Sequence, residues 1–74
     1  MADASRDTIT FQYLKQKATI RKSNRPGQFN YLIGFIAGKE YKFDEPSENV
    51  IVFQTQEAYN RVIQEASNLG FDFH

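Results

Sequence analysis

The residues that most often carry enzyme chemistry are almost missing from this chain. It has no cysteine, and its one histidine is His74, the last residue of the sequence. Without a thiol or an internal imidazole, neither a Cys–His nor a Ser–His pair can form, and a zinc site built on thiolates is excluded. We expect His74 to be a frayed end, because a general base must be held within hydrogen-bond reach of its substrate.

Acidic residues offer the remaining chemistry, and several of them gather in one segment. Asp44, Glu45 and Glu48 are close in sequence, but the spacing of a calcium-binding loop does not surround them. The four glycines are scattered, so no phosphate-binding loop is present. Two carboxylates such as Glu40 and Asp44 can act as an acid–base pair, yet nothing in the sequence favours it. We therefore expect a solvated acidic loop in a protein that is not an enzyme and uses no metal, cofactor or small-molecule substrate.

Alternating apolar and polar residues predict a sheet before residue 54. Thr8–Tyr13 alternates cleanly, whereas Leu14–Lys17 breaks the alternation, so residues 8–17 read as one strand, two strands or a helical turn. Arg25–Gln28 contains Pro-Gly, which is typical of a type II turn. Further strands are expected over 18–22, 29–36, 40–43 and 50–53, with 29–36 central, a hairpin loop at 38–39 and a polar loop at 44–49.

The C-terminal part of the chain predicts one amphipathic helix over residues 56–69. Thr55 is a suitable N-cap, and Glu57 in the first turn matches the positive end of the helix dipole. Gly70 is placed to end the helix, and Phe71 can fold back on the last turn. A buried stripe is expected from residues that recur every three or four positions: Ala58, Tyr59, Val62, Ile63, Ala66 and Leu69.

Together these elements predict an α+β domain, with an antiparallel sheet of three to five strands and one C-terminal amphipathic α-helix packed on one face. Residues 1–7 are small and polar and are expected to form a disordered tail, which leaves 8–74 as a single domain. Seven Phe and four Tyr are available to a chain that has no disulfide. Since one helix covers one face of the sheet, the other face is expected to carry surplus aromatic side chains.

Charge is divided between the two halves of the chain, although the net charge is zero. Residues 1–38 contain six basic and two acidic groups, while residues 39–74 contain three basic and seven acidic groups. This division bears on binding partners rather than on the fold. No apolar run is long enough to span a bilayer, and none follows a basic start, so the sequence predicts a cytoplasmic protein without membrane contact.

Surplus aromatic rings and the acidic loop favour a small regulatory module that binds another protein. Tyrosine and phenylalanine are enriched at interface cores, and an acidic segment attracts a basic partner. A homodimer that pairs the same faces accounts for these features as well. Alternatively, the aromatic side chains are all buried in the core, and none is left for an interface. The predicted protein-binding residues are Tyr31, Tyr41, Phe43, Asp44, Glu45 and Glu48.

A single-stranded nucleic-acid-binding domain is the alternative hypothesis. Five cations and two aromatic rings lie between residues 15 and 31, where cations can neutralise phosphates and rings can stack on bases. A strand-rich sheet followed by one helix, joined at Phe53–Ala58, resembles in element order the repeat of PUR-type proteins and the arm-binding domains of tyrosine recombinases. That resemblance implies nucleic-acid binding and carries over no site residue. The residues expected to bind are Lys17, Arg21, Lys22, Arg25, Phe29 and Tyr31.

Overall fold

The chain forms two β-hairpins, each followed by an α-helix. The structure is a computed structural model that describes residues 7–73, so His74 and all but the last residue of the predicted tail lie outside it. The α+β class is confirmed, but a second helix joins the one expected. In chain order the elements are β1 (Thr8–Tyr13), β2 (Gln16–Arg21), a 3₁₀ turn η2 (Lys22–Asn24), α1 (Pro26–Lys39), β3 (Phe43–Ser47), β4 (Val50–Phe53) and α2 (Gln56–Asn68).

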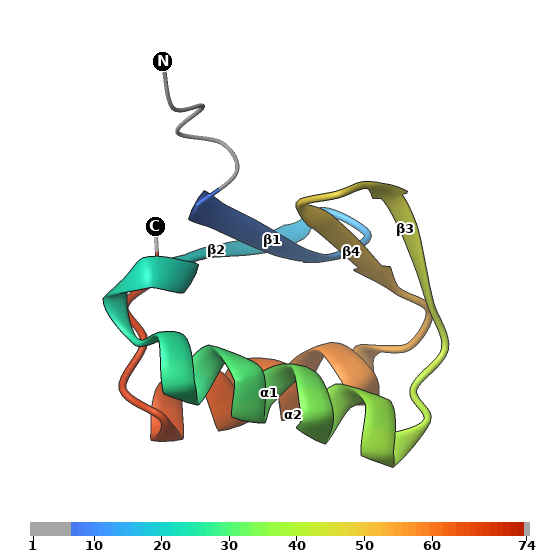
Figure 1. The fold of residues 1–74 in the computed structure, drawn as a ribbon. Helices are drawn as coiled ribbons and strands as arrows, with labels where there is room; N and C mark the ends of the chain where they lie inside the picture. The colour runs from blue at the N-terminus through green and yellow to red at the C-terminus, as the bar shows by residue number, and fades with distance from the viewer. Residues whose placement is uncertain (1–6, 74) are drawn as a thin grey trace.

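The sheet is mixed, and the prediction of a purely antiparallel sheet was wrong. Its strand order is β2-β1-β4-β3, with antiparallel pairs β1–β2 and β3–β4 and a parallel pair β1–β4. A parallel pair needs a long crossover connection, and α1 supplies it between the two hairpins. Figure 1 shows both helices on the same side of the sheet.

Residues 29–36, predicted as a central strand, form the middle of α1. The apolar residues of this segment fit both the alternation of a strand and the period of a helix. Phe29, Ile33 and Ile36 are spaced three and four apart, which places them on one side of a helix. Pro26 occupies the first turn of α1, where its fixed φ suits a helix and its missing N–H costs nothing. Leu32 and Ile36 are buried on the helix side that faces the sheet. Tertiary packing therefore decides between two readings that the sequence pattern leaves equal.

Two expected turns are helix ends instead. The Pro-Gly turn at 25–28 is the beginning of α1, and the hairpin loop at 38–39 is its last turn. Glu40 closes the helix in the left-handed region at φ 57°, and its N–H donates to the Ala37 carbonyl at 3.2 Å. The strand expected at 40–43 begins at Phe43 and continues through the segment predicted as a loop. Pro46 is tolerated there because β3 is an edge strand with a register shift between Asp44 and Ser47.

The open question at residues 8–17 resolves into two strands joined by a tight turn. Leu14 and Lys15 form the turn, and Tyr13 pairs with Gln16 across it. Leu14 takes φ 53°, a left-handed conformation that glycine or asparagine adopts more easily. The absence of such a residue explains why the sequence gives no turn signal here.

Helix α2 begins at Gln56 as predicted and ends at Asn68, one residue before the predicted end. The Thr55 hydroxyl accepts a hydrogen bond from the Ala58 N–H at 3.1 Å. Gly70 takes φ 93° and donates to the Ser67 carbonyl at 3.0 Å, while the Phe71 N–H donates to the Ala66 carbonyl at 3.1 Å. This pair of bonds is a Schellman motif, and it folds Phe71 back into the core.

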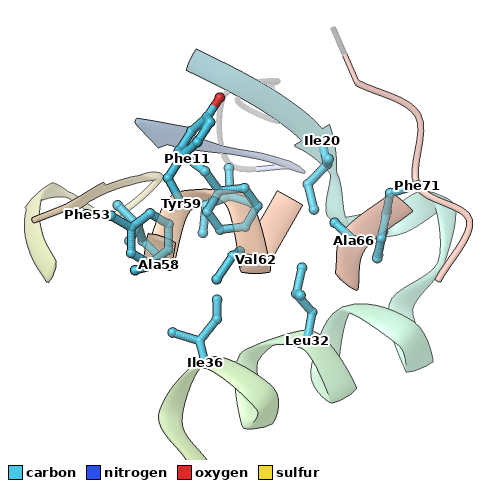
Figure 2. Packing of buried hydrophobic residues seen from close by; sticks show 12 residues of the cluster. Phe11, Ile20, Leu32, Ile36, Phe53, Ala58, Tyr59, Val62, Ala66 and Phe71 are labelled. Carbon is cyan, nitrogen blue, oxygen red and sulfur yellow. The ribbon is translucent and has the colours of Figure 1, made fainter. Parts of the chain in front are cut away.

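The core lies between the sheet and the two helices (Figure 2). The Phe11 and Phe53 rings, from the paired central strands, lie 6.1 Å apart at an interplanar angle of 28°. Val62 of α2 and Leu32 of α1 are fully buried beneath them. The cluster comprises Ile9, Phe11, Ile20, Leu32, Ile36, Ile51, Phe53, Ala58, Tyr59, Val62, Ala66 and Phe71.

The sheet face opposite the helices carries Val50 and Val52 on β4 and no aromatic ring on any described strand, so the expected aromatic sheet face is absent. Thr10 and Thr19 are hydrogen-bonded there through their hydroxyl groups at 2.8 Å. Of the rings expected on that face, Tyr31 lies on α1, whereas Tyr13 and Tyr41 pack against the core. On β1 and β2 the outward residues, which alternate with the buried ones, are Thr8, Thr10, Gln12, Lys17, Thr19 and Arg21.

Candidate functional site

A hollow of about 300 Å³ lies between α1 and the sheet, on the side of the β3–β4 hairpin. Seven of its ten lining residues are apolar, and the other three are charged. Its volume is at the lower end of the range for binding pockets, and its mostly apolar lining with a few polar groups is typical of them. The hollow is lined by Ile9, Lys22, Phe29, Ile33, Ile36, Ala37, Phe43, Glu45, Glu48 and Ile51.

One wall of the hollow is a side of α1. Phe29, Ile33, Ile36 and Ala37 share this side because residues three and four apart in a helix are neighbours. Ile36 is buried, whereas Ile33 keeps 38% of its surface exposed. No charged residue occurs in α1 before Lys39, so the wall is apolar along its whole length. An apolar side chain that enters the hollow would therefore cover Ile33.

The floor and the opposite wall are continuous with the core. Ile9 and Ile51, from the adjacent central strands, are 4% and 6% exposed. The Phe43 ring packs edge-on against Phe53, with ring centroids 6.0 Å apart and an angle of 68°. Because these side chains are fixed by core packing, the shape of the hollow is formed before anything binds.

The rim of the hollow carries both signs of charge. Glu45, on β3, and Glu48, in the turn after it, contribute two carboxylates. Lys22 contributes one ammonium group, which lies 5.6 Å from the centroid of the Phe29 ring in a cation–π contact. With two carboxylates against one cation, the rim favours a positively charged group next to an apolar one.

Three of the six predicted protein-binding residues meet at the hollow, namely Phe43, Glu45 and Glu48. Asp44 pairs with Val52 and alternates with Phe43, so it faces the other side of the sheet. The other two line no part of the hollow. Tyr31 is 59% exposed on α1, and Tyr41 is half-buried with its ring 6.5 Å from that of Phe35.

The residues of the nucleic-acid hypothesis are divided among several surfaces. Lys22 and Phe29 line the hollow, while Lys17 and Arg21 lie on the outer face of β2. The Arg25 Nε donates to the Gly70 carbonyl at 3.1 Å, which ties the start of α1 to the end of α2. Tyr31 is also on α1, outside the hollow. The structure therefore does not unite the predicted cations and rings into one groove.

Other chemistry finds little support among residues 7–73. Apart from the Tyr59 phenol, no side chain with a polar or charged group is buried there, and no group of three acidic or histidine side chains comes together as a metal site does. Burial raises the pKa of the Tyr59 phenol above its usual value. Neither helix is long and apolar enough to cross a membrane.

Sequence reasoning missed the apolar half of the site. The sequence pattern predicts a strand over 29–36, in which neighbouring side chains alternate between the two faces of the sheet. The strand would therefore place Ile33 and Ile36 on opposite faces, with Ala37 just after its end. The signal that identifies them is the spacing of three and four between Phe29, Ile33, Ile36 and Ala37. Comparison with known proteins adds nothing to this site, because no family model, no curated protein and no solved structure matches the chain.

Proposed function

We propose that the protein is a small, non-enzymatic binding module that takes an apolar side chain of a partner protein into the hollow. The observation that carries this proposal is the hollow itself, with seven apolar residues in its walls and two carboxylates at its rim. Basic residues beside the partner's apolar anchor would lie next to Glu45 and Glu48. A sequence without cysteine fits a reducing compartment, and we propose that the module acts in the cytoplasm.

The energetics of such a site favour weak and reversible binding. Burial of one aliphatic side chain contributes about 1.5–3 kcal/mol, and the loss of translational and rotational freedom opposes association. Exposed carboxylates act mainly on the association rate and on specificity. Their attraction for a basic partner is screened over about 8–10 Å at physiological salt. Affinity is therefore expected to decrease as salt is added, while the apolar contact persists.

The experiment is an NMR titration of the ¹⁵N-labelled protein with a capped Arg-Lys-Leu-Lys-Arg peptide. Amide shifts are expected at Ile33, Phe43 and Glu45, because these residues surround the occupied hollow. An Arg-Lys-Gly-Lys-Arg peptide lacks the anchor, and a Glu-Glu-Leu-Glu-Glu peptide reverses the flanking charge. Both are expected to bind about tenfold more weakly or not at all.

A matched pair of variants assigns the binding to the hollow. Ile33→Lys places a cation inside the hollow and should abolish the shifts, whereas Tyr31→Lys makes the same charge change on the exposed side of α1 and should not. Replacing both rim carboxylates, in a Glu45→Gln and Glu48→Gln double variant, should weaken binding and reduce its salt dependence. Equal binding by the Ile33→Lys and Tyr31→Lys variants would show that the hollow is not the site.

Nucleic-acid binding stays a second candidate on one observation. Lys17 and Arg21 of β2 share the outer face of the sheet with the hydroxyls of Thr10 and Thr19, which can contact phosphates. Base stacking has less support, because the described strands carry no aromatic ring on that face. A titration against a fluorescent oligothymidine at about 50 mM salt decides this candidate, since phosphate contacts are strongest at low salt. A Lys17→Glu and Arg21→Glu double variant should lose all such binding.

A further inference from the structure

The turn between β1 and β2 holds a leucine in an unfavourable place. Leu14 is 70% exposed, the largest value among the exposed large hydrophobic residues in the described part of the chain. Its φ of 53° lies in the left-handed region, where a residue with a β-carbon is strained and glycine is preferred. Neither solubility nor turn geometry explains a leucine here. Strain and exposure that serve no folding purpose point to a functional contact.

Side-chain hydrogen bonds connect the turn to its own strands and to α2. The Gln12 side-chain amide donates to the Leu14 carbonyl at 3.2 Å. Gln16 and Gln56 exchange a pair of side-chain hydrogen bonds at 2.7 and 3.1 Å, which fastens the hairpin to the beginning of α2. Lys15 and Lys17 are both exposed beside the leucine. The turn therefore presents an exposed apolar side chain followed closely by two exposed cations, and this combination matches the apolar walls and the carboxylates of the hollow.

Leu14 does not reach the hollow of its own chain. Ile9, on the floor of the hollow, lies near the start of β1, and Leu14 follows the end of the same strand. Five residues of extended strand separate their Cα atoms by about 16 Å. We infer that the occupant of the hollow is Leu14 of a second copy of this chain, with Lys15 and Lys17 beside Glu45 and Glu48. This inference rests on the proposed function, because it names the partner of the same site.

The contact joins two different surfaces, so it is heterologous. Each copy that donates its leucine keeps a free hollow, and association continues head to tail unless a ring closes. One side chain and its flanks bury less surface than a standard interface of about 1,600 Å². Self-association is therefore expected to be weak and to rise with concentration and fall with salt.

Sedimentation equilibrium between about 10 μM and 1 mM tests the inference with two variants. Leu14→Gly removes the anchor and relieves the strained φ, so it folds at least as well as the parent. Ile33→Lys blocks the hollow. The parent protein should exceed its monomer mass of 8.6 kDa as concentration rises, and each variant alone should remain a monomer. A 1:1 mixture should form a dimer and nothing larger, because Leu14→Gly supplies the one intact hollow and Ile33→Lys the one intact leucine.

Three outcomes overturn the inference: a parent protein that stays monomeric at 1 mM, a Leu14→Gly variant that associates like the parent, or a mixture that stays monomeric. Titration with the Arg-Lys-Leu-Lys-Arg peptide distinguishes failure of this inference from failure of the proposed function. If the Leu14→Gly variant binds the peptide in its hollow while the parent protein remains a monomer, the hollow is a binding site but a second copy does not occupy it. If the peptide leaves the hollow of Leu14→Gly unperturbed, the proposed function fails as well. Tyr31→Lys serves as the charge-matched control for Ile33→Lys and should associate like the parent.

Discussion

The two helices of this small protein are formed in different ways. Helix α2 carries its own local signals, a Thr55 hydroxyl bonded at its beginning and Gly70 in the left-handed conformation at its end. Helix α1 has no side-chain cap and no acidic residue in its first turn, and it contains three glycines, which lower helix propensity. Short helices without such signals are marginal in water, so contact with the sheet must hold α1 in place.

The two helices also differ in how completely their apolar side chains are buried. The buried stripe of α2, with Ala58, Tyr59, Val62 and Ala66, packs entirely into the core. Helix α1 fully buries only Leu32 and Ile36, and its other apolar side chains are partly buried or exposed. The comparison shows that α2 completes the fold, whereas α1 is held by the fold and keeps exposed apolar side chains such as Tyr31 and Ile33. The predictions below test this difference.

The largest effect is expected from Leu32→Ala, which removes the contact that fixes α1. This side chain is fully buried, and its truncation should lower the free energy of unfolding by about 2–5 kcal/mol. For a domain of this size that loss consumes much of the total stability. Urea denaturation followed by circular dichroism measures it, and a loss below about 1 kcal/mol would contradict tertiary anchoring of α1.

A smaller loss is expected from Thr55→Ala, which removes the cap of α2. The hydroxyl bond to the Ala58 N–H should be worth about 1 kcal/mol in the same denaturation experiment. Thr55→Ser keeps the hydroxyl and should restore most of the stability. If Thr55→Ala were neutral, α2 would be no more locally encoded than α1, and the comparison would lose its basis.

A gain of stability is expected from Gly34→Ala in α1. A β-carbon added there meets no atom within 4 Å, and alanine is a better helix former than glycine by about 0.5–1 kcal/mol. Gly38→Ala should behave alike, because its surroundings are equally open. The midpoint of urea unfolding should rise for both. A decrease would show that the open side of α1 is covered by some other surface in solution.

The smallest effect is expected from Tyr59→Phe at alkaline pH. Burial raises the pKa of this phenol above the value near 10 that it has in the unfolded chain. Below about pH 10 the phenol is neutral in both states and stability is unaffected. As pH rises further, the unfolded state ionises first and the folded state is destabilised. Tyr59→Phe should therefore lose less stability than the parent between about pH 9 and 11, with Tyr31→Phe as the exposed control.

The sequence allows prediction of those elements whose signals are local. The strands at Thr8–Tyr13 and Val50–Phe53 follow from alternation and apolar character, and α2 follows from its caps and stripe. Helix α1 was not predicted, because its apolar residues fit a strand as well as a helix and its Pro-Gly start resembles a turn. Without α1 there is no crossover, so the parallel pairing of β1 with β4 could not be predicted either.

The residues of the candidate site also fall into those that the sequence indicates and those that only the folded structure reveals. Phe43, Glu45 and Glu48 were selected from the sequence by residue type, and all three line the hollow. The α1 side of the hollow depends on a helix that tertiary contacts select. The helical spacing that includes Ile33 is present in the sequence, but the same residues fit a strand equally well, so the spacing alone could not assign Ile33 to the hollow. Leu14 was passed over for a related reason, since its exposure and its positive φ are properties of the folded hairpin.

Helix α1 forms one wall of the hollow, and NMR tests directly whether residues 29–36 are helical. Backbone assignment of the ¹³C,¹⁵N-labelled protein should give helical Cα and Cβ secondary shifts throughout residues 29–36. Nuclear Overhauser contacts should connect the buried Leu32 and Ile36 side chains of α1 with the other members of the core cluster. Strand-type secondary shifts over the same residues, with cross-strand contacts in place of helical ones, would contradict the account.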